Sequence, residues 1–215
     1  PGNKAMRSTS LFSSQDLKIW KYEHNFMKNE CFLPPGEDAS CPYFWPIGNR
    51  YIFLFFSHTT GSQYLLGDYN KEEHCFYPTF HGRFNFMSFL PGGVHAPSAT
   101  SDGEGGVIVI HNMHTGKKSP GWRGITTLPR KLTLDKCDTI NIQPYGDYKS
   151  LRTHHQHIDK THLPANKEII IDNIQGNALE IKAEINIKSS PMIEMNVLRS
   201  PDKEEFTSIK FFKDR

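Results

Sequence analysis

The sequence has few cysteines, and they form no recognised motif. The 215 residues include four cysteines, Cys31, Cys41, Cys75 and Cys137, and no two of them have C-x-x-C spacing. This spacing excludes a zinc finger and a thioredoxin-like redox motif. We expect free or buried thiols, while a Cys31–Cys41 disulfide stays open as an alternative without further support.

Long hydrophobic runs and an excess of charge of one sign are also missing. No segment approaches the length of about 18 apolar residues that a membrane-spanning helix needs. The formal net charge is +2, and Lys and Arg are scattered along the chain. We therefore expect neither nucleic acid nor a membrane as a partner. Pro1–Lys4 contains no initiator Met, and no signal-peptide apolar segment follows. We expect the sequence to begin inside a longer chain, and its compartment is unknown.

Aromatic residues and strand patterns, by contrast, are abundant. The chain has 15 Phe and 8 Tyr, residue types that favour strands. Residues 50–57 form a continuous apolar and aromatic run, which predicts a strand buried on both faces. No long amphipathic helix is predicted, and residues 16–20 indicate a single helical turn. Further strands are predicted at 63–69, 74–80, 107–113, 124–129, 131–134 and 139–143.

These strands form repeating groups separated by Gly-rich turns. The two longest apolar runs begin at Tyr51 and Val107, roughly 50 residues apart, which is near the repeat length of β-propeller blades. Residues 1–153 hold about three blades of this length, whereas a propeller closes with at least about four. An unclosed propeller exposes strand edges. Either the remaining blades lie outside this sequence or the fold is atypical.

From residue 154 onward the pattern indicates a second, sandwich-like domain, 154–215. Apolar and polar residues alternate strictly over 179–187, which predicts a half-solvated antiparallel strand. Further strands are predicted at 168–174, 192–198 and 206–212. A histidine cluster marks the predicted link. In an extended segment His155 and His157 share one face and His154 lies on the other, so we predict a solvated linker and no metal site.

Several motifs resemble one known family, in order along nearly the whole chain. Residues 13–20 read S-x-x-DL-x-x-W, residues 121–134 read GW-x-G and then LPR-x-L, and residues 143–152 read QPYGDYKSLR. This combination resembles glycoside hydrolase family 32, the invertase-like β-fructosidases. The resemblance implies an all-β fold, here part of a five-bladed β-propeller (about three blades) followed by part of a β-sandwich.

The resemblance also implies retaining hydrolysis of fructosyl or related glycosidic bonds. Such enzymes use two carboxylates about 5–5.5 Å apart, one as nucleophile and one as acid/base. In the family the nucleophile lies in a WMNDPNG-like motif and a stabilising Asp in an RDP motif. Neither motif occurs here, and we expect both upstream of Pro1. We predict that this chain alone is inactive, and we expect no cofactor and no metal.

The acid/base of the family is the Glu of an ECPD-like motif, and here it is ambiguous. Residues 40–48 align with this motif without gaps and place Ser40 at the catalytic position, where a hydroxyl cannot act as an acid near neutral pH. Glu37 and Asp38 precede it and could reach the same space through a bulge. Glu30 precedes Cys31 as in the motif. We rank Glu37 first, Asp38 second and Glu30 third. A solvated acidic loop is the alternative.

The substrate side of the predicted site contains Trp122, His95 and Ser40. The resemblance implies that Trp122 stacks on a sugar, the alternative being a Trp that closes a blade core. His95 stands at a family tyrosine position, where it could hydrogen-bond a sugar hydroxyl or a backbone group. The expected partner is a fructoside or related glycan. Two rival hypotheses are a non-catalytic carbohydrate-binding propeller, and a chain that associates with the missing N-terminal blades.

Overall fold

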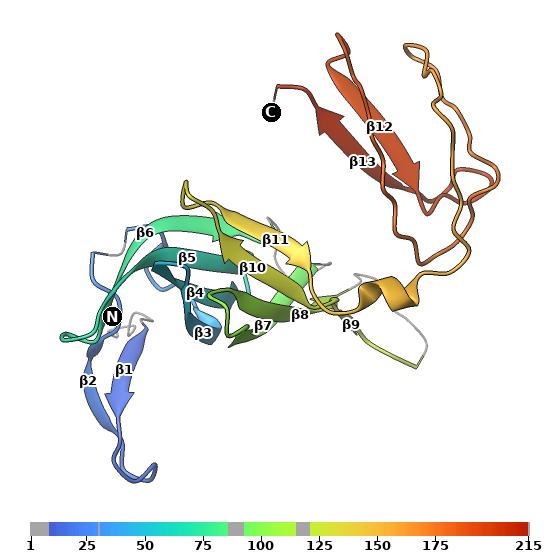
Figure 1. The fold of residues 1–215 in the computed structure, drawn as a ribbon. Coiled ribbons are helices and arrows are strands. Elements are labelled where there is room, and N and C mark those ends of the chain that lie inside the picture. The colour runs from blue at the N-terminus through green and yellow to red at the C-terminus, as the bar shows by residue number, and fades with distance from the viewer. Residues whose placement is uncertain (1–8, 30, 86–92, 115–120, 215) are drawn as a thin grey trace, which may run out of the picture. The chain divides into compact units, whose positions relative to one another are not determined.

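The computed structural model describes residues 9–29, 31–85, 93–114 and 121–214, and it is built almost wholly from β-strands. The chain divides into two compact units, residues 1–147 and 148–215. The described residues contain no helix long and apolar enough to cross a membrane. Figure 1 shows the order of the strands along each unit.

The first unit contains three antiparallel sheets in sequence order (Figure 1). The first sheet is a hairpin and the next two have four and five strands. The hairpin is β1 (Ser10–Ser13) and β2 (Lys21–Asn25); the second sheet is β3 (Ser40–Ile47), β4 (Arg50–Ser57), β5 (Gly61–Asn70) and β6 (Cys75–Arg83); the third is β7 (Gly93–Ser101), β8 (Val107–His114), β9 (Ile125–Thr126), β10 (Arg130–Leu134) and β11 (Ile140–Pro144).

The second sheet is a consecutive meander, in which each strand pairs with the next one along the chain. The pairing register of this sheet shifts at two points, one between Ser40 and Tyr43 and one between Leu66 and Gly67. A Cβ atom at Gly67 would lie 2.2 Å from the Tyr77 carbonyl oxygen. Glycine is therefore the residue that lets β5 and β6 approach this closely.

The third sheet is a meander with one interruption. β10 pairs with the first half of β8, at Val107–Val109, while the two-residue β9 pairs with Asn112 and Met113 near its end. The predicted strand at 124–129 is therefore shorter than expected. It ends before Pro129, which has no N–H to donate to a ladder.

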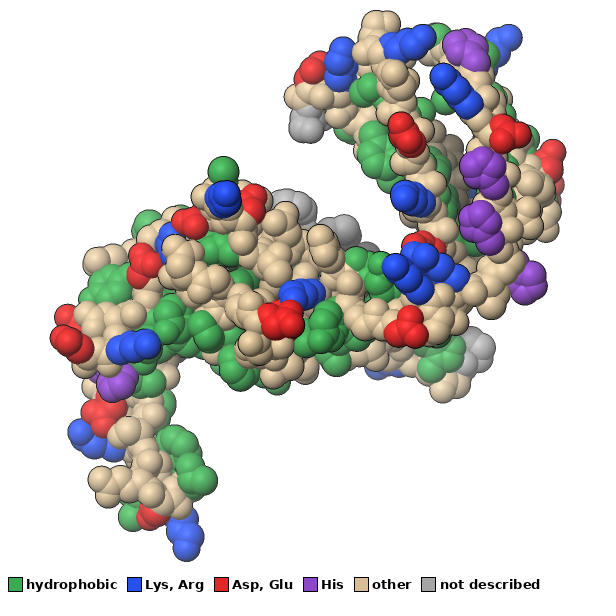
Figure 2. Space-filling view, in the orientation of Figure 1, with side chains coloured by type: hydrophobic (Ala, Val, Ile, Leu, Met, Phe, Trp, Pro, Cys, Tyr) green, Lys and Arg blue, Asp and Glu red, His purple; other side chains and the backbone are tan. Residues whose placement is uncertain are grey.

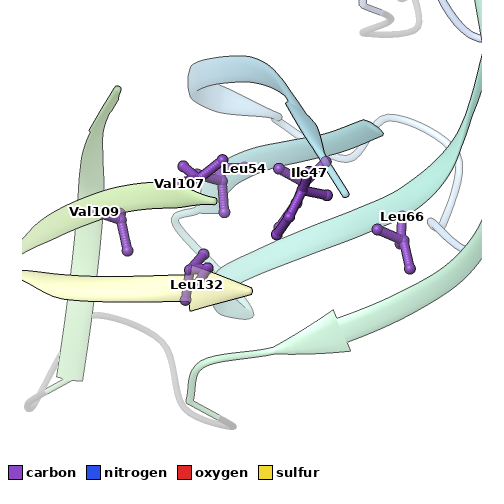
Figure 3. Close-up of a cluster of buried hydrophobic side chains, with 7 residues drawn as sticks. Ile47, Leu54, Leu66, Val107, Val109 and Leu132 are labelled. Atoms are coloured by element: carbon purple, nitrogen blue, oxygen red, sulfur yellow. The ribbon is translucent and has the colours of Figure 1, made fainter. Parts of the chain in front are cut away.

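Two apolar clusters explain why the run at 50–57 is buried on both faces. Ile52 and Leu54 of β4 pack with Val107, Val109 and Leu132 of the third sheet, and Figure 3 shows Leu54 with these three residues. Successive residues of a strand point to opposite faces, and the intervening Phe53 and Phe55 lie in a second cluster, with Phe26 and Phe76. Each sheet is thus packed against its sequence neighbours, as blades are in a propeller.

These features confirm the predicted all-β fold with a partial propeller. The described residues contain two blade-like sheets and the β1–β2 hairpin. The single helical turn predicted at 16–20 is wrong, because this segment is a series of bends. The Asp16 carboxylate accepts hydrogen bonds from the backbone N–H groups of Lys18 and Ile19, at 2.8 and 2.9 Å, which is a turn that competes with a helix.

The second unit contains the short 3-10 helix η1 (Tyr148–Leu151) and one antiparallel hairpin, β12 (Met192–Val197) with β13 (Thr207–Phe212). This hairpin confirms two of the four strands predicted for the partial sandwich. The strands predicted at 168–174 and 179–187 are wrong, since neither range contains strand structure. Most of their apolar side chains stay exposed, and a strand pattern forms a ladder only where a partner pairs with it.

Arg50 links the two blade-like sheets through its guanidinium group. Its Nε lies 2.9 Å from an Asp68 carboxylate oxygen, and its other nitrogens contact Thr79 and Asp138. Asp138 lies in the turn between β10 and β11, and the Arg50 side chain is only 15% exposed. Hydrogen bonds to charged groups are the stronger class in proteins, at about 1.5–3 kcal/mol each.

Asp68 and Asp138 are 66% and 46% exposed, so solvent screens both ion pairs. Replacing Arg50 with Ala should therefore lower the free energy of unfolding by about 1–2 kcal/mol, because it removes both pairs and the packing of a side chain that is itself only 15% exposed. Urea unfolding followed by tryptophan fluorescence measures the change. Lys71→Ala, in the exposed turn between β5 and β6, is the matched control and should change stability by less than about 0.5 kcal/mol. An Arg50 variant as stable as this control would contradict the assignment.

Candidate functional site

The predicted acid/base candidates lie in the loop that leads into β3. Asp38 is half-buried and its carboxylate bonds to His58, in the turn after β4: Asp38 Oδ2 lies 2.5 Å from His58 Nδ1, and Oδ1 accepts from the His58 backbone N–H at 3.2 Å. Ser40 Oγ lies 3.5 Å from the same carboxylate. The loop is therefore fixed to the β4–β5 turn, which makes Asp38 a held group and not a solvated one.

Glu37 occupies a different environment from its neighbour. Its Oε1 accepts from the Asp38 backbone N–H at 2.9 Å, and its Oε2 accepts from the Thr60 hydroxyl at 3.2 Å. Thr60 in turn accepts from the Gln63 side-chain amide at 2.6 Å, and the Gln63 oxygen lies 2.7 Å from His81 Nε2. A polar network thus runs from β6 through the fully buried Gln63 to the Glu37 carboxyl.

The two carboxyls therefore differ in the chemistry of their partners. Asp38 is paired with the imidazole of His58. The contacts of Glu37 are with a backbone amide and a hydroxyl, both neutral donors. A general acid must be able to hold a proton before it gives it to the leaving group. The ranking of Glu37 ahead of Asp38 as the acid stays a prediction.

His95 lies on β7, beside a bulge between His95 and Pro97. Its ring centre is 5.4 Å from that of Phe56 and 4.8 Å from that of His114, with which it stacks. Phe56 in turn lies 4.9 Å from the ring of His58. Burial lowers the pKa of His95, the nearby His114 and His58 add to this, and a backbone hydrogen bond with Gly93 partly opposes it.

The rings thus form a row between the loop that contains Glu37 and Asp38 and the third sheet. Asp38 contacts His58, which packs on Phe56, and Phe56 packs on His95. The structure brings three of the predicted residues, Asp38, Ser40 and His95, to one row, and places Glu37 directly beside it.

The GW-x-G segment forms the turn before β9. Gly121 and Gly124 have φ values of 82° and 84°, in the left-handed region that glycine tolerates. A Cβ atom at Gly124 would lie 3.0 Å from the Met113 carbonyl oxygen, so this turn lies close on β8. The Trp122 side chain is 51% exposed. An exposed indole on a fixed turn is available for stacking on a sugar ring.

A cavity of about 270 Å³ lies beside this turn, a volume suited to a single small ligand unit. It is lined by His95 from β7, by residues of β8, and by the turn and β9. The lining residues are His95, Asn112, Met113, His114, Arg123, Gly124, Ile125 and Thr126. Figure 2 shows basic and acidic side chains interspersed over the visible face of the first unit, in keeping with the scattered charge of the sequence.

Several groups of this site were not predicted from the sequence, namely His58, Thr60, Gln63, His114 and Arg123. A signal was present for Gln63, a polar residue inside an otherwise apolar strand. Glu30 lies outside the described residues, so its place in the site stays a prediction.

Cys31, Cys41, Cys75 and Cys137 are free thiols, of which Cys75 is buried. Among the residues described, no His, Cys, Asp and Glu side chains gather into a group of three or more that could hold a metal ion.

Comparisons of the sequence and of the fold with known proteins point to one family. The family model described as the glycosyl hydrolases family 32 N-terminal domain matches residues 2–144. A solved structure of a glycoside hydrolase family 32 protein from Bifidobacterium adolescentis is similar in fold, with a TM-score of 0.50 and 15% sequence identity. The similarity covers 70% of this chain and 26% of that one, so this chain spans about a quarter of that protein's length. No curated protein matches the sequence.

Proposed function

We propose that this chain, which belongs to glycoside hydrolase family 32, contributes the acid/base side and part of the sugar-binding wall of a retaining glycosidase that acts on fructosyl or related bonds. The proposal covers the protein assembled with the missing blades. The chain alone binds carbohydrate without cleaving it, because the nucleophile and stabiliser motifs of the family do not occur in its sequence. Its domains are proposed to divide at residues 153 and 154.

The observation that carries this proposal is the way the Glu37 carboxyl is held. Thr60 and the Asp38 amide fix both of its oxygens, and the buried Gln63 fixes Thr60. A proton donor in glycoside hydrolysis must be aimed at the leaving oxygen, and fixed supporting groups provide that aim. A solvated acidic loop needs no such buried support.

We assign the other residues from their positions. Asp38 holds the loop through His58, and Ser40 begins β3 beside it. His95 and Trp122 are assigned to substrate binding, His95 beside the cavity and Trp122 on the adjacent turn. In a retaining mechanism Glu37 protonates the leaving oxygen while the nucleophile, supplied by the missing blades, attacks the anomeric carbon; Glu37 then takes a proton from the water that releases the sugar.

The test is calorimetric titration of the 215-residue chain with fructan oligosaccharides, together with an assay for released sugar. We expect binding and no hydrolysis of sucrose, inulin or levan. Trp122→Ala should weaken binding by about 2- to 10-fold, since aromatic contacts contribute about 0.5–1.5 kcal/mol. Leu128→Ala, at an exposed residue four positions beyond Gly124, is the control and should bind as the parent does. Hydrolysis by this chain alone would contradict the proposal, and absence of any glycan binding would remove its support.

A further inference from the structure

The cavity beside the GW-x-G turn has an unusual set of polar groups for a neutral sugar. Its lining contains two imidazoles, His95 and His114, and the guanidinium of Arg123, and none of its described lining residues is acidic. Arg123 is exposed on the turn. The remaining polar side chains of the lining, Asn112 and Thr126, are neutral.

The elements that support these three groups come from both sides of the cavity. His95 extends from β7 and His114 from β8, and their stacked rings are 4.8 Å apart between centres. Arg123 is brought to the same place by the glycine turn that lies on Met113. Three nitrogen-bearing side chains therefore converge from separate elements on one space of about 270 Å³.

We infer that this cavity binds an anionic substituent of the glycan, a carboxylate or a sulfate ester, with Arg123 and the His95–His114 pair as its donors. The inference rests on the glycan-binding function proposed above and specifies its substrate class. Arg matches carboxylate and sulfate-like oxygens with paired N–H donors, and hydrogen bonds between charged groups are about twice as strong as neutral ones. A neutral fructan offers no counter-charge for this set.

Protonation of His95 should be coupled to binding. In the free protein burial and the neighbouring His114 lower the pKa of His95, so the ring is neutral at pH 7. The charged or titratable groups around it are His114, Arg123, His58 with its partner Asp38, and the buried His111. A bound anion favours the imidazolium form, so the complex takes up a proton and binding strengthens as the pH falls.

The experiment is titration of the 215-residue chain with three oligosaccharides of equal length: a neutral fructan, a uronate-containing one and a sulfated one. We expect at least one charged ligand to bind about tenfold or more tightly than the neutral one, with affinity rising up to tenfold per pH unit from pH 7.5 to 6.5 for each proton taken up. The preference between the two charged ligands identifies the substituent. Arg123→Gln and His114→Gln should remove the difference, whereas Lys71→Gln should not.

Two outcomes separate this inference from the proposed function. Equal binding of neutral and charged glycans, with no effect of Arg123→Gln, would overturn the anionic specificity and leave the glycosidase proposal intact. Binding of inorganic sulfate or of a sulfated polymer that is not a glycan, with no binding of any oligosaccharide, would overturn both. Circular dichroism of each variant establishes that a lost preference does not come from unfolding.

Discussion

Replacing Glu37 with Gln should reduce the turnover of an unactivated substrate such as sucrose by about 10²–10⁴-fold in the assembled enzyme that we propose above, in which other blades supply the nucleophile. General acid–base catalysis contributes a factor of this size. The amide keeps the shape of the carboxyl, but its single oxygen can accept from only one of the two donors, the Asp38 amide or the Thr60 hydroxyl. It cannot protonate the leaving oxygen. The measurement is steady-state kcat for the assembled enzyme and its Glu37→Gln variant.

The basicity of the leaving group distinguishes loss of the proton donor from a general disturbance of the active-site structure. A substrate with an aryl leaving group of low basicity needs little protonation. Its rate of cleavage should therefore fall far less in Glu37→Gln than the rate for sucrose. Asp38→Asn is the matched comparison from the same loop. We expect Asp38→Asn to lower the turnover of both substrates to a similar, smaller extent, because it disturbs the pair with His58 and not the proton donor. The reverse pattern would make Asp38 the acid.

Thr60 and Gln63 are positioning residues in this scheme, and they show why sequence alone could not complete the site. Thr60 lies 23 positions from Glu37 and reaches it only because β4 and β5 form a tight turn beside the β3 loop. Gln63 contacts His81 across a ladder of paired strands. Local pattern predicts strands, but hydrogen bonds between distant turns depend on how the sheets are packed.

The strand predictions are confirmed where other described residues pack against the strand and bury it. The run at 50–57 coincides with β4 because neighbours pack on both of its faces. The stricter alternation at 179–187 gave the clearer strand signal and failed, since no described strand pairs with it and residues such as Ile181 stay 46% exposed. Amphipathic periodicity predicts a strand only if a partner is present to bury its apolar face.

The second large effect that we predict is a loss of stability in acid, caused by the buried side chain of His111. It lies on β8 with no exposed surface, and neither ring nitrogen has a hydrogen-bond partner among the described residues. Phe84 packs on it, with ring centres 5.0 Å apart, and its backbone N–H and C=O are bound by Thr127. Burial, with smaller contributions from Arg130 and His95, lowers the pKa of His111 to about 4.

The sign follows from linkage between proton binding and folding. An unfolded histidine has a pKa of about 6.5, so between pH 6.5 and 4 the unfolded chain binds a proton that the folded chain does not. The stability is present in full above pH 6.5 and falls as the pH drops, by about 3 kcal/mol near pH 4, at 1.36 kcal/mol per pKa unit. Urea unfolding at pH 7, 6, 5 and 4 measures this slope.

His111→Leu should remove most of this acid sensitivity and leave stability at pH 7 unchanged or higher. Leucine has a similar volume, cannot be protonated, and leaves no polar nitrogen buried without a partner, a state that costs about 1–3 kcal/mol. His155→Gln, in the exposed segment of the second unit, should retain the full pH slope. If His111→Leu and the parent lose stability in parallel from pH 7 to 4, then the buried imidazole is not the group that titrates, and His95, whose pKa burial also lowers, becomes the next one to replace.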